Sequence, residues 1–378
     1  MKVGIVVPYS WSYWGGVNEH VELKVEALHR LGIETRTIIG HDPPGSFTRV
    51  LHPRHGRHGR PPADVIPVGR SVIVPANGAL PNIVLSPSAM VRVKRALRRE
   101  RFDVLHLHEP MTPVICTTTL AWAECPVVAT FHASGKLGWN TLGAPVWGFL
   151  MNRIDHRIAV TEAARESAVR WYGGDYELIP NGVLIPPEAD PAGREDRIVF
   201  VGRHDPRKGM AVLLRAWPEI RRRTGATLRL VGADPLMVRL ALTRLGLDDD
   251  GIDPLGFLSQ EALTEELLRA KALVAPSLGG ESFGMVLTRA FACATPVVAS
   301  DIPGYGDVMT AEAGVTFPAG DERALVETVA ALLDDEQRRR SLGEGARRLA
   351  LERYSWNDVA LRLEAIYERV LGRERVAA

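Results

Sequence analysis

Cysteine is scarce in this chain. Its three cysteines, Cys116, Cys125 and Cys293, are widely spaced and include no Cys-x-x-Cys pair. So few thiols at such spacing argue against a disulfide framework and against a cysteine-bound zinc site. We therefore expect a reducing, cytoplasmic environment.

Long apolar runs and an excess of either charge are also lacking. The first apolar run, Val3 to Val7, is halted by Pro8 and is too short for a signal-peptide core or a membrane span. With 46 basic and 45 acidic residues, the formal net charge is +1. No overall electrostatic field draws the chain to nucleic acid, which we do not expect as a partner, and any attraction to a membrane must be local.

What the chain does have is a recurring α/β pattern. Its 378 residues, 46% of them hydrophobic, predict two domains with substantial cores. Short apolar runs alternate with amphipathic stretches such as Val17 to Leu31, which is typical of βαβ units around a parallel sheet. The runs are Val3 to Val7, Thr35 to Ile39, Val104 to Leu107, Val127 to Phe131, Arg157 to Val160, Ile198 to Val201, Leu228 to Val231, Leu273 to Ala275, Val297 to Ala299 and Val315 to Phe317.

A proline-rich interval, Ile179 to Pro191, separates the two halves of this pattern, because proline disfavours a continuing helix or central strand. We predict two Rossmann-like domains, residues 1–180 and 181–355, whose parallel sheets face each other across a ligand-binding cleft. The last helical stretch, within residues 356–378, is expected to pack back on the first domain through one apolar stripe. The stripe consists of Val359, Leu363, Ile366 and Val370.

Two motifs place polar groups directly after predicted strands. Gly15 and Gly16 open a helix, where backbone amides can approach an anionic or polyol ligand. A tight turn that touches nothing is the alternative. Arg203 and Lys208 flank a turn in the second domain and can bring two cations to one diphosphate. A solvated basic turn is the alternative there.

The most distinctive motif, Pro276 to Met285, also follows a predicted strand. Its glycines expose backbone amides, and Glu281 among them can accept hydrogen bonds from sugar hydroxyls. Together the motifs resemble those of the retaining glycosyltransferases of family 4, which have the GT-B fold, and among them the phosphatidylinositol mannosyltransferases. The likeness covers nearly the whole chain. It is carried by Pro8-Tyr9-Ser10, Gly15-Gly16-Val17, His106 to Pro110, Phe131-His132, Pro180 to Val183, Gly202-Arg203, Arg207 to Met210 and Gly279 to Gly284.

The resemblance implies that a hexose, in particular mannose, moves from a GDP- or UDP-sugar to a glycolipid or polyol with retention at the anomeric carbon. No tightly bound cofactor and no protein-held metal are expected, although a divalent ion on the diphosphate is compatible. Arg203 and Lys208 would stabilise the departing diphosphate, and Glu281 would hold the sugar. His132 would lie beside the sugar and orient it, unless it is a structural histidine. The further donor contacts implied are Gly15, Gly16, Gly280, Ser282, Phe283, Gly284 and Arg289.

The donor site departs from the family pattern at one position. Where family members usually have a second glutamate that accepts hydrogen bonds from the ribose, this chain has Arg289. Arginine has no acceptor, so we expect donor affinity to fall by about 10- to 100-fold. The alternatives are an arginine recruited to a phosphate, an outward-pointing side chain, or a nucleotide-binding protein that has lost catalysis.

The acceptor side departs as well. Tyr9, Asn18, Asn77 and Lys136 match expected contacts with inositol or phosphate, with Asn18 standing where the pattern has glutamine. The segment after Asn77 lacks the basic residues that meet a lipid phosphate in the resembling enzymes. A transferase acting on a soluble acceptor is therefore the alternative.

Membrane contact is expected through the stretch from Ser88 to Arg101. Met90, Val93 and Leu97 form an apolar stripe in it, beside a basic face that can lie on anionic lipid at the inner face of the cell membrane. The alternative is a stripe that packs on the sheet and a basic face that is only solvated. The basic residues are Arg92, Lys94, Arg95, Arg98, Arg99 and Arg101. A second basic region contains His52, His55 and His58, which we interpret as a loop rather than a metal site.

Overall fold

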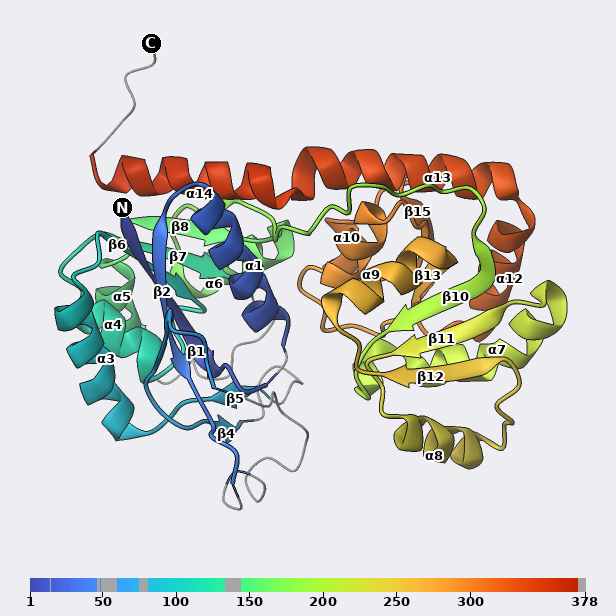
Figure 1. Ribbon diagram of the computed structural model, residues 1–378, viewed down its shortest axis with the longest axis horizontal. Coiled ribbons are helices and arrows are strands. Elements are labelled where there is room, and N and C mark those ends of the chain that lie inside the picture. The colour runs from blue at the N-terminus through green and yellow to red at the C-terminus, as the bar shows by residue number, and fades with distance from the viewer. Residues whose placement is uncertain (14, 46–47, 49–59, 75–80, 133–143, 373–378) are drawn as a thin grey trace, which may run out of the picture. The chain divides into compact units, whose positions relative to one another are not determined.

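The computed structural model describes residues 1–13, 15–45, 48, 60–74, 81–132 and 144–372 (Figure 1). The chain divides into two compact units. Unit 1 comprises Met1–Gly182 and Trp356–Ala378, and unit 2 comprises Val183–Ser355. Unit 1 thus ends its first segment at Gly182, compared with residue 180 in the prediction. Within the described ranges, no helix is long and apolar enough to cross a membrane.

Unit 1 is built on a mainly parallel sheet of nine strands. Its path runs β3-β2-β1-β6-β7-β8-β9, while β4 and β5 form an antiparallel pair attached to β1. The central strands are almost fully buried, and their Val, Ile and Leu side chains suit a strand that is covered on both faces. The bounds are β1 (Lys2–Ser10), β2 (Glu34–Gly40), β3 (Val65–Pro67), β4 (Val72–Ile73), β5 (Asn82–Ile83), β6 (Val104–His108), β7 (Val127–Phe131), β8 (His156–Ala159) and β9 (Glu177–Leu178).

Helices cover both faces of this sheet, with α1 on one side and α3 and α4 on the other (Figure 1). The last helix, α14 (Trp356–Val370), packs against α1, as its apolar stripe predicts. Val359, Leu363 and Ile366 are each buried to within 2% in the same core as Val3 and Ile5. The other helices of unit 1 are α1 (Gly16–Arg30), α3 (Pro87–Glu100), α4 (Ile115–Trp122), α5 (Ala144–Met151) and α6 (Glu162–Tyr172).

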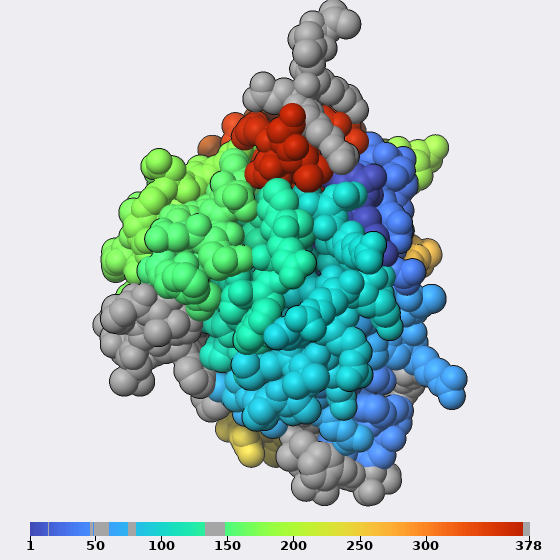
Figure 2. Space-filling view, turned by 90° about the vertical axis from the view of Figure 1, so that its left-hand side faces the viewer, coloured from blue at the N-terminus to red at the C-terminus, as the bar shows by residue number. Residues whose placement is uncertain are grey.

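The apolar stripe of α3 differs from the one predicted. Val93 is fully buried, but its buried neighbours are Ala89 and Ala96, whereas Met90 is 39% exposed. The buried stripe therefore packs on unit 1, because Ala89, Val93 and Ala96 lie three or four residues apart on one helix face. The basic face is at the surface, and the α3 side of unit 1 faces the viewer in Figure 2. Its exposed arginines are Arg92, Arg95, Arg98, Arg99 and Arg101.

Unit 2 contains a parallel sheet of six strands in the order β12-β11-β10-β13-β14-β15. One cluster of its core has Phe200, Trp217 and Phe317 as its largest side chains. The strands are β10 (Glu195–Val201), β11 (Thr227–Val231), β12 (Ile252–Gly256), β13 (Ala270–Ala275), β14 (Val297–Asp301) and β15 (Gly314–Pro318). The helices are η2 (Pro206–Lys208), α7 (Met210–Thr224), α8 (Pro235–Leu245), α9 (Gln260–Arg269), α10 (Met285–Ala292), α11 (Pro303–Gly306), α12 (Glu322–Asp334), α13 (Glu336–Leu349) and η3 (Ala350–Tyr354).

Candidate active site

In unit 2 the candidate site lies where two adjacent parallel strands, β10 and β13, end. The turn that contains η2 follows β10, and the loop from Pro276 to Gly284 follows β13. The two segments are joined by a hydrogen bond from the Leu278 amide to the Arg207 carbonyl oxygen, at 2.7 Å. Gly209 allows this approach, because it has φ +69° and a Cβ there would lie 1.8 Å from the Pro276 carbonyl oxygen.

An ion pair between Lys208 and Glu281 occupies this junction. Lys208 Nζ lies 2.7 Å from Glu281 Oε1, and the two side chains are 27% and 12% exposed. The backbone of Glu281 is held by α11, since a Cβ at Gly304 would lie 1.9 Å from the Glu281 carbonyl oxygen. The structure therefore brings together two of the predicted catalytic residues, at a place that remains open to solvent.

The remaining predicted donor contacts of unit 2 surround this pair in the sequence. Arg203 follows β10 directly and is exposed. Gly280 and Gly284 have positive φ angles of 71° and 73°, which turn the chain around Glu281 and favour glycine. Ser282 is half-buried, whereas Phe283 is 4% exposed and packs edge-on against Tyr354. Phe283 thus contributes to the core beneath the loop.

Arg289 lies on α10 and is not directed into solvent. Its guanidinium donates a hydrogen bond to Gln260 Oε1 on α9, at 2.8 Å. Burial lowers the pKa of Arg289 to about 10, which leaves it charged at neutral pH. The outward-pointing alternative was therefore wrong, and a cation occupies the position at which the family pattern has a carboxylate.

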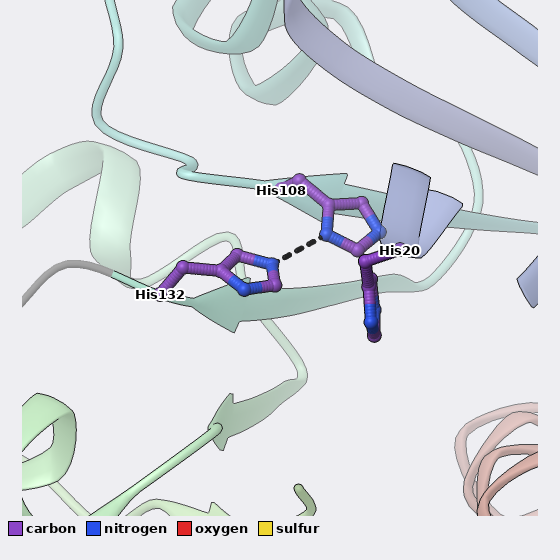
Figure 3. Close-up of side chains that lie close together, drawn as sticks. All are labelled: His20, His108 and His132. Carbon is purple, nitrogen blue, oxygen red and sulfur yellow. Dashed lines mark hydrogen bonds between the residues drawn. The ribbon is translucent and has the colours of Figure 1, made fainter. Parts of the chain in front are cut away.

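In unit 1, His132 follows β7 and is 7% exposed. Its Nε2 atom is hydrogen-bonded to His108 Nδ1, at 2.7 Å, and the two rings are stacked (Figure 3). The backbone amide of His132 donates to Glu109 Oε1, at 2.9 Å. Burial, and secondarily the charge of Lys24, lowers the pKa of His132 to about 3, so its ring is neutral at neutral pH. His132 is therefore held by neighbours at the ends of β6 and β7.

Behind His132 lies a buried polar network that sequence reasoning missed. Lys24, on α1, is only 1% exposed, and its Nζ lies 2.9 Å from His108 Nε2 and 3.3 Å from His106 Nε2. His106 is also hydrogen-bonded to Thr130 Oγ1 and to the Tyr367 hydroxyl, both at 2.6 Å. The residues of this buried network come from α1, β6, β7 and α14. The His106-x-His108 spacing is the one sequence signal, because residues two apart on a strand point to the same face.

Three histidines of this region could hold a metal ion. Ring nitrogens of His20, His108 and His132 lie within 4.8 Å of one another. No motif in the sequence predicts this group, and both ring nitrogens of His20 lack a hydrogen-bond partner among the described residues. Zinc–nitrogen bonds of about 2.0–2.1 Å require tetrahedral ligand atoms to be about 3.3 Å apart. The 2.7 Å bond between His108 and His132 would therefore have to open.

The predicted acceptor residues are only partly described. Tyr9, at the end of β1, is half-buried, and Asn18 is 6% exposed near the start of α1. The Asn18 amide nitrogen donates to the carbonyl oxygens of Ser10 and Tyr13, at 2.7 and 2.9 Å, while its Oδ1 has no partner among the described residues. Gly15 and Gly16 form the N-cap and first residue of α1. Asn77, Lys136, His52, His55 and His58 lie outside the described residues.

Comparisons with known proteins cover both units. The "Glycosyltransferase Family 4" model matches residues 14–184, and the "Glycosyl transferases group 1" model matches residues 195–335. A phosphatidyl-myo-inositol mannosyltransferase of Mycobacterium leprae is 35% identical over 98% of this chain and 97% of its own length. That of Mycolicibacterium smegmatis is 34% identical over 98% and 95%. The chain belongs to glycosyltransferase family 4.

Solved structures agree with this membership at the level of the fold. A sucrose-phosphate synthase of Thermosynechococcus elongatus has a TM-score of 0.73 at 20% identity, covering 98% of this family 4 chain and 100% of its own. Anabaena Alr3699/HepE in complex with UDP has a TM-score of 0.70 at 18% identity, with the same coverages. The predicted α/β class and GT-B fold are thus confirmed. This family 4 glycosyltransferase is an enzyme of the hexosyltransferase type.

Proposed function

We propose that this glycosyltransferase moves mannose from a nucleotide diphosphate sugar to a glycolipid such as phosphatidylinositol, with retention at the anomeric carbon. Support comes from the relatives named phosphatidyl-myo-inositol mannosyltransferase, which match nearly the whole chain. The nucleotide sugar is the cosubstrate in this proposal, and no tightly bound cofactor is needed. A lipid acceptor would require the enzyme to work at a membrane surface.

The observation that carries the proposal is the contact between Lys208 and Glu281 at the ends of β10 and β13. A cation binds phosphate, and a carboxylate accepts hydrogen bonds from sugar hydroxyls. Because the two groups touch, a ligand that engages both must carry its phosphate next to its sugar. A hexose bonded directly to a diphosphate has this arrangement.

The same residues provide the chemistry of the transfer. As the bond between the sugar and the diphosphate breaks, positive charge develops on the sugar and negative charge on the departing diphosphate. Lys208, with Arg203 after β10, would stabilise the leaving group, and Glu281 would keep the hexose in position. In this proposal the Lys208 ammonium turns from Glu281 to phosphate when the donor binds, so the ion pair belongs to the free enzyme.

On the acceptor side, two features of unit 1 support a polyol attached to a lipid. Asn18 Oδ1 is a buried acceptor without a partner among the described residues, and a hydroxyl group of the polyol would satisfy it. Beside α3 there is a pocket of about 440 Å³ whose lining includes Lys94, Arg98 and Trp122. Lys94 Nζ lies 4.8 Å from the centre of the Trp122 ring, so cationic and apolar groups meet at this surface.

Transfer is tested by incubating the enzyme with GDP-mannose or UDP-hexoses and vesicles that contain phosphatidylinositol. We expect mannosylated lipid, with the α configuration of the donor in the proton spectrum of the product. Lys208→Met and Glu281→Gln should each lower kcat/KM by about 100-fold or more. Lys271→Met, at the amino end of β13, is the matched control. Equal activity of all three variants, or no nucleotide sugar bound at millimolar concentration, would remove the proposal.

The lipid and soluble acceptors are distinguished by co-sedimentation with vesicles. Replacing Arg95 and Arg99 of α3 by glutamate should abolish binding to anionic vesicles, because each charge near the surface contributes about 1 kcal/mol. Transfer to a short-chain soluble acceptor should be unaffected. Wild-type enzyme that never binds anionic vesicles, yet mannosylates free inositol, would favour the soluble acceptor.

A further inference from the structure

Lys24 is a buried amine without a carboxylate. It is 1% exposed, and among the described residues it makes no ion pair. Burial lowers its pKa well below the usual value. An amine in this position is costly unless its N–H groups are hydrogen-bonded. Among the described residues, the hydrogen-bonding neighbours of its Nζ atom are two imidazole nitrogens, His106 Nε2 and His108 Nε2, so these determine how Lys24 is satisfied.

Hydrogen-bond counting gives the direction of these contacts. An ammonium group has three donors and no acceptor, and a neutral amine has two donors and one lone pair. Lys24 can donate to His108 Nε2 and, at 3.3 Å, to His106 Nε2, which then also accepts from the Thr130 hydroxyl. Each imidazole then accepts at Nε2, and at least two N–H groups of Lys24 are satisfied. If His108 donated instead, the neutral amine would keep one N–H group buried without a partner, which is the costlier defect.

The direction of the hydrogen bond between Lys24 and His108 determines which ring nitrogen carries the proton in His108 and in His132. A neutral imidazole has one N–H donor and one acceptor nitrogen. When His108 accepts at Nε2, its proton lies on Nδ1, and this N–H donates to His132 Nε2 at 2.7 Å. His132 must then carry its own proton on Nδ1. Without a donor at residue 24, the chain of bonds can run in the opposite direction, with His132 protonated on Nε2.

We propose that Lys24 is a positioning residue for the transfer reaction, which sets the tautomer of His132 through His108 so that His132 presents an N–H donor at Nδ1. The kinetic consequence rests on the proposed function and on the position that the family resemblance implies for His132, beside the donor sugar. Lys24 itself touches no substrate in this proposal. An Nδ1–H group donates to a sugar oxygen, whereas the opposite tautomer offers that oxygen only a lone pair.

The tautomer is measured directly, without substrate, by long-range proton–nitrogen NMR of protein labelled with ¹⁵N-histidine. We expect His132 with a protonated Nδ1 in the wild-type enzyme and a shift towards protonated Nε2 in Lys24→Met. His132→Gln assigns the signals, and Lys271→Met is the control for replacing a lysine. Wild-type His132 protonated on Nε2, or an unchanged tautomer in Lys24→Met, overturns the proposal. The wild-type spectrum decides the first point even if the variant does not fold.

Kinetics provide the second readout. Lys24→Met should lower kcat about tenfold, the effect of losing one hydrogen bond, with little change in donor KM. In a His108→Phe background the same replacement should have no further effect, because the connection to His132 is already broken. Additive losses in the double variant would contradict a route through His108. Absence of transfer by the wild-type enzyme would count against the proposed function and leave the tautomer result standing.

Discussion

Arg289 is the residue at which this chain differs most clearly in chemistry from the pattern of its family. Its guanidinium donates a hydrogen bond to Gln260, so a cation stands at the position where the family pattern has a carboxylate. Arg289→Glu should tighten GDP or UDP binding by about 10- to 100-fold in isothermal titration, because a carboxylate can accept from the ribose hydroxyls.

Arg289→Gln is the matched control, since it removes the charge without supplying a carboxylate. Tighter binding in Arg289→Glu alone would show that the ribose site is otherwise intact. Weaker binding in both variants would instead show that Arg289 already contacts the ligand, as expected if it had been recruited to a phosphate.

The buried histidines make stability depend on pH. Burial lowers the pKa values of His20, His106, His108 and His132 in the folded state, that of His132 to about 3. The unfolded chain therefore binds protons first, and stability is complete above pH 6.5 and is lost as the pH falls below it. The loss approaches about 1.4 kcal/mol per pH unit for each histidine.

Calorimetry at pH 7, 6 and 5 should accordingly show a falling Tm. His20→Leu should reduce the slope, since His20 is 3% exposed and neither ring nitrogen has a partner among the described residues. A slope in His20→Leu identical to that of the wild-type protein would contradict the assignment.

The sequence predicted one part of the candidate site and not the other. Lys208 and Glu281 belong to local motifs after strands, so their meeting follows from the adjacency of β10 and β13. Lys24 was not predicted, because a lysine in an amphipathic helix is usually exposed. Its partners His106 and His108 lie 82 and 84 residues away, and no local pattern records such a contact.

At the scale of elements, two glycines have similar backbone angles but different surroundings. Gly209 has φ +69° and stands against Pro276, whereas Gly225, at the end of α7, has φ +68° and nothing within 4 Å of a Cβ. Gly225→Ala should cost about 1–2 kcal/mol of unfolding free energy through backbone strain alone.

Gly209→Ala should cost about 1–3 kcal/mol more, because the added carbon overlaps the Pro276 carbonyl. It should also weaken donor binding, since the loop that carries Glu281 is displaced. Denaturant unfolding and titration with donor measure the two effects. Equal stabilities of the two variants would show that the contact with Pro276 relaxes freely.

Most strands could be predicted from apolar runs, as β7 and β14 show, because parallel strands buried on both faces need continuous apolar sequence. β12 was not predicted. It contains Pro254 and ends at Gly256, which both disfavour a strand. β12 lies at the edge of the sheet, which explains how the proline is tolerated: on the side that pairs with no strand, no backbone N–H donor is needed.

At the scale of the whole molecule, α14 completes unit 1 from the far end of the chain. The Trp356 ring lies against Gly182, where a Cβ would come within 2.4 Å of it, and Tyr367 is fully buried. Deleting residues 356–378 removes five large buried side chains, each contributing about 1.5–3 kcal/mol, which approaches the whole stability of a domain. They are Trp356, Val359, Leu363, Ile366 and Tyr367.

We expect calorimetry of this truncated chain to lose the transition of unit 1 and keep that of unit 2. Deleting only the residues after Gly372 is the control and should preserve both transitions. Retention of both in the longer deletion would mean that α14 is dispensable for unit 1.

Because α14 is translated last, unit 1 is completed only at the end of synthesis. A ribosome translates all of unit 2 before it reaches Trp356, so unit 2 has time to fold while unit 1 still lacks α14. A message that stops early would yield a protein with Lys208 and Glu281 in place but no Tyr367 to bond His106. In the proposed function, such a product would keep the residues that bind nucleotide sugar but lack a complete unit 1, so it would hold the donor without transferring the sugar.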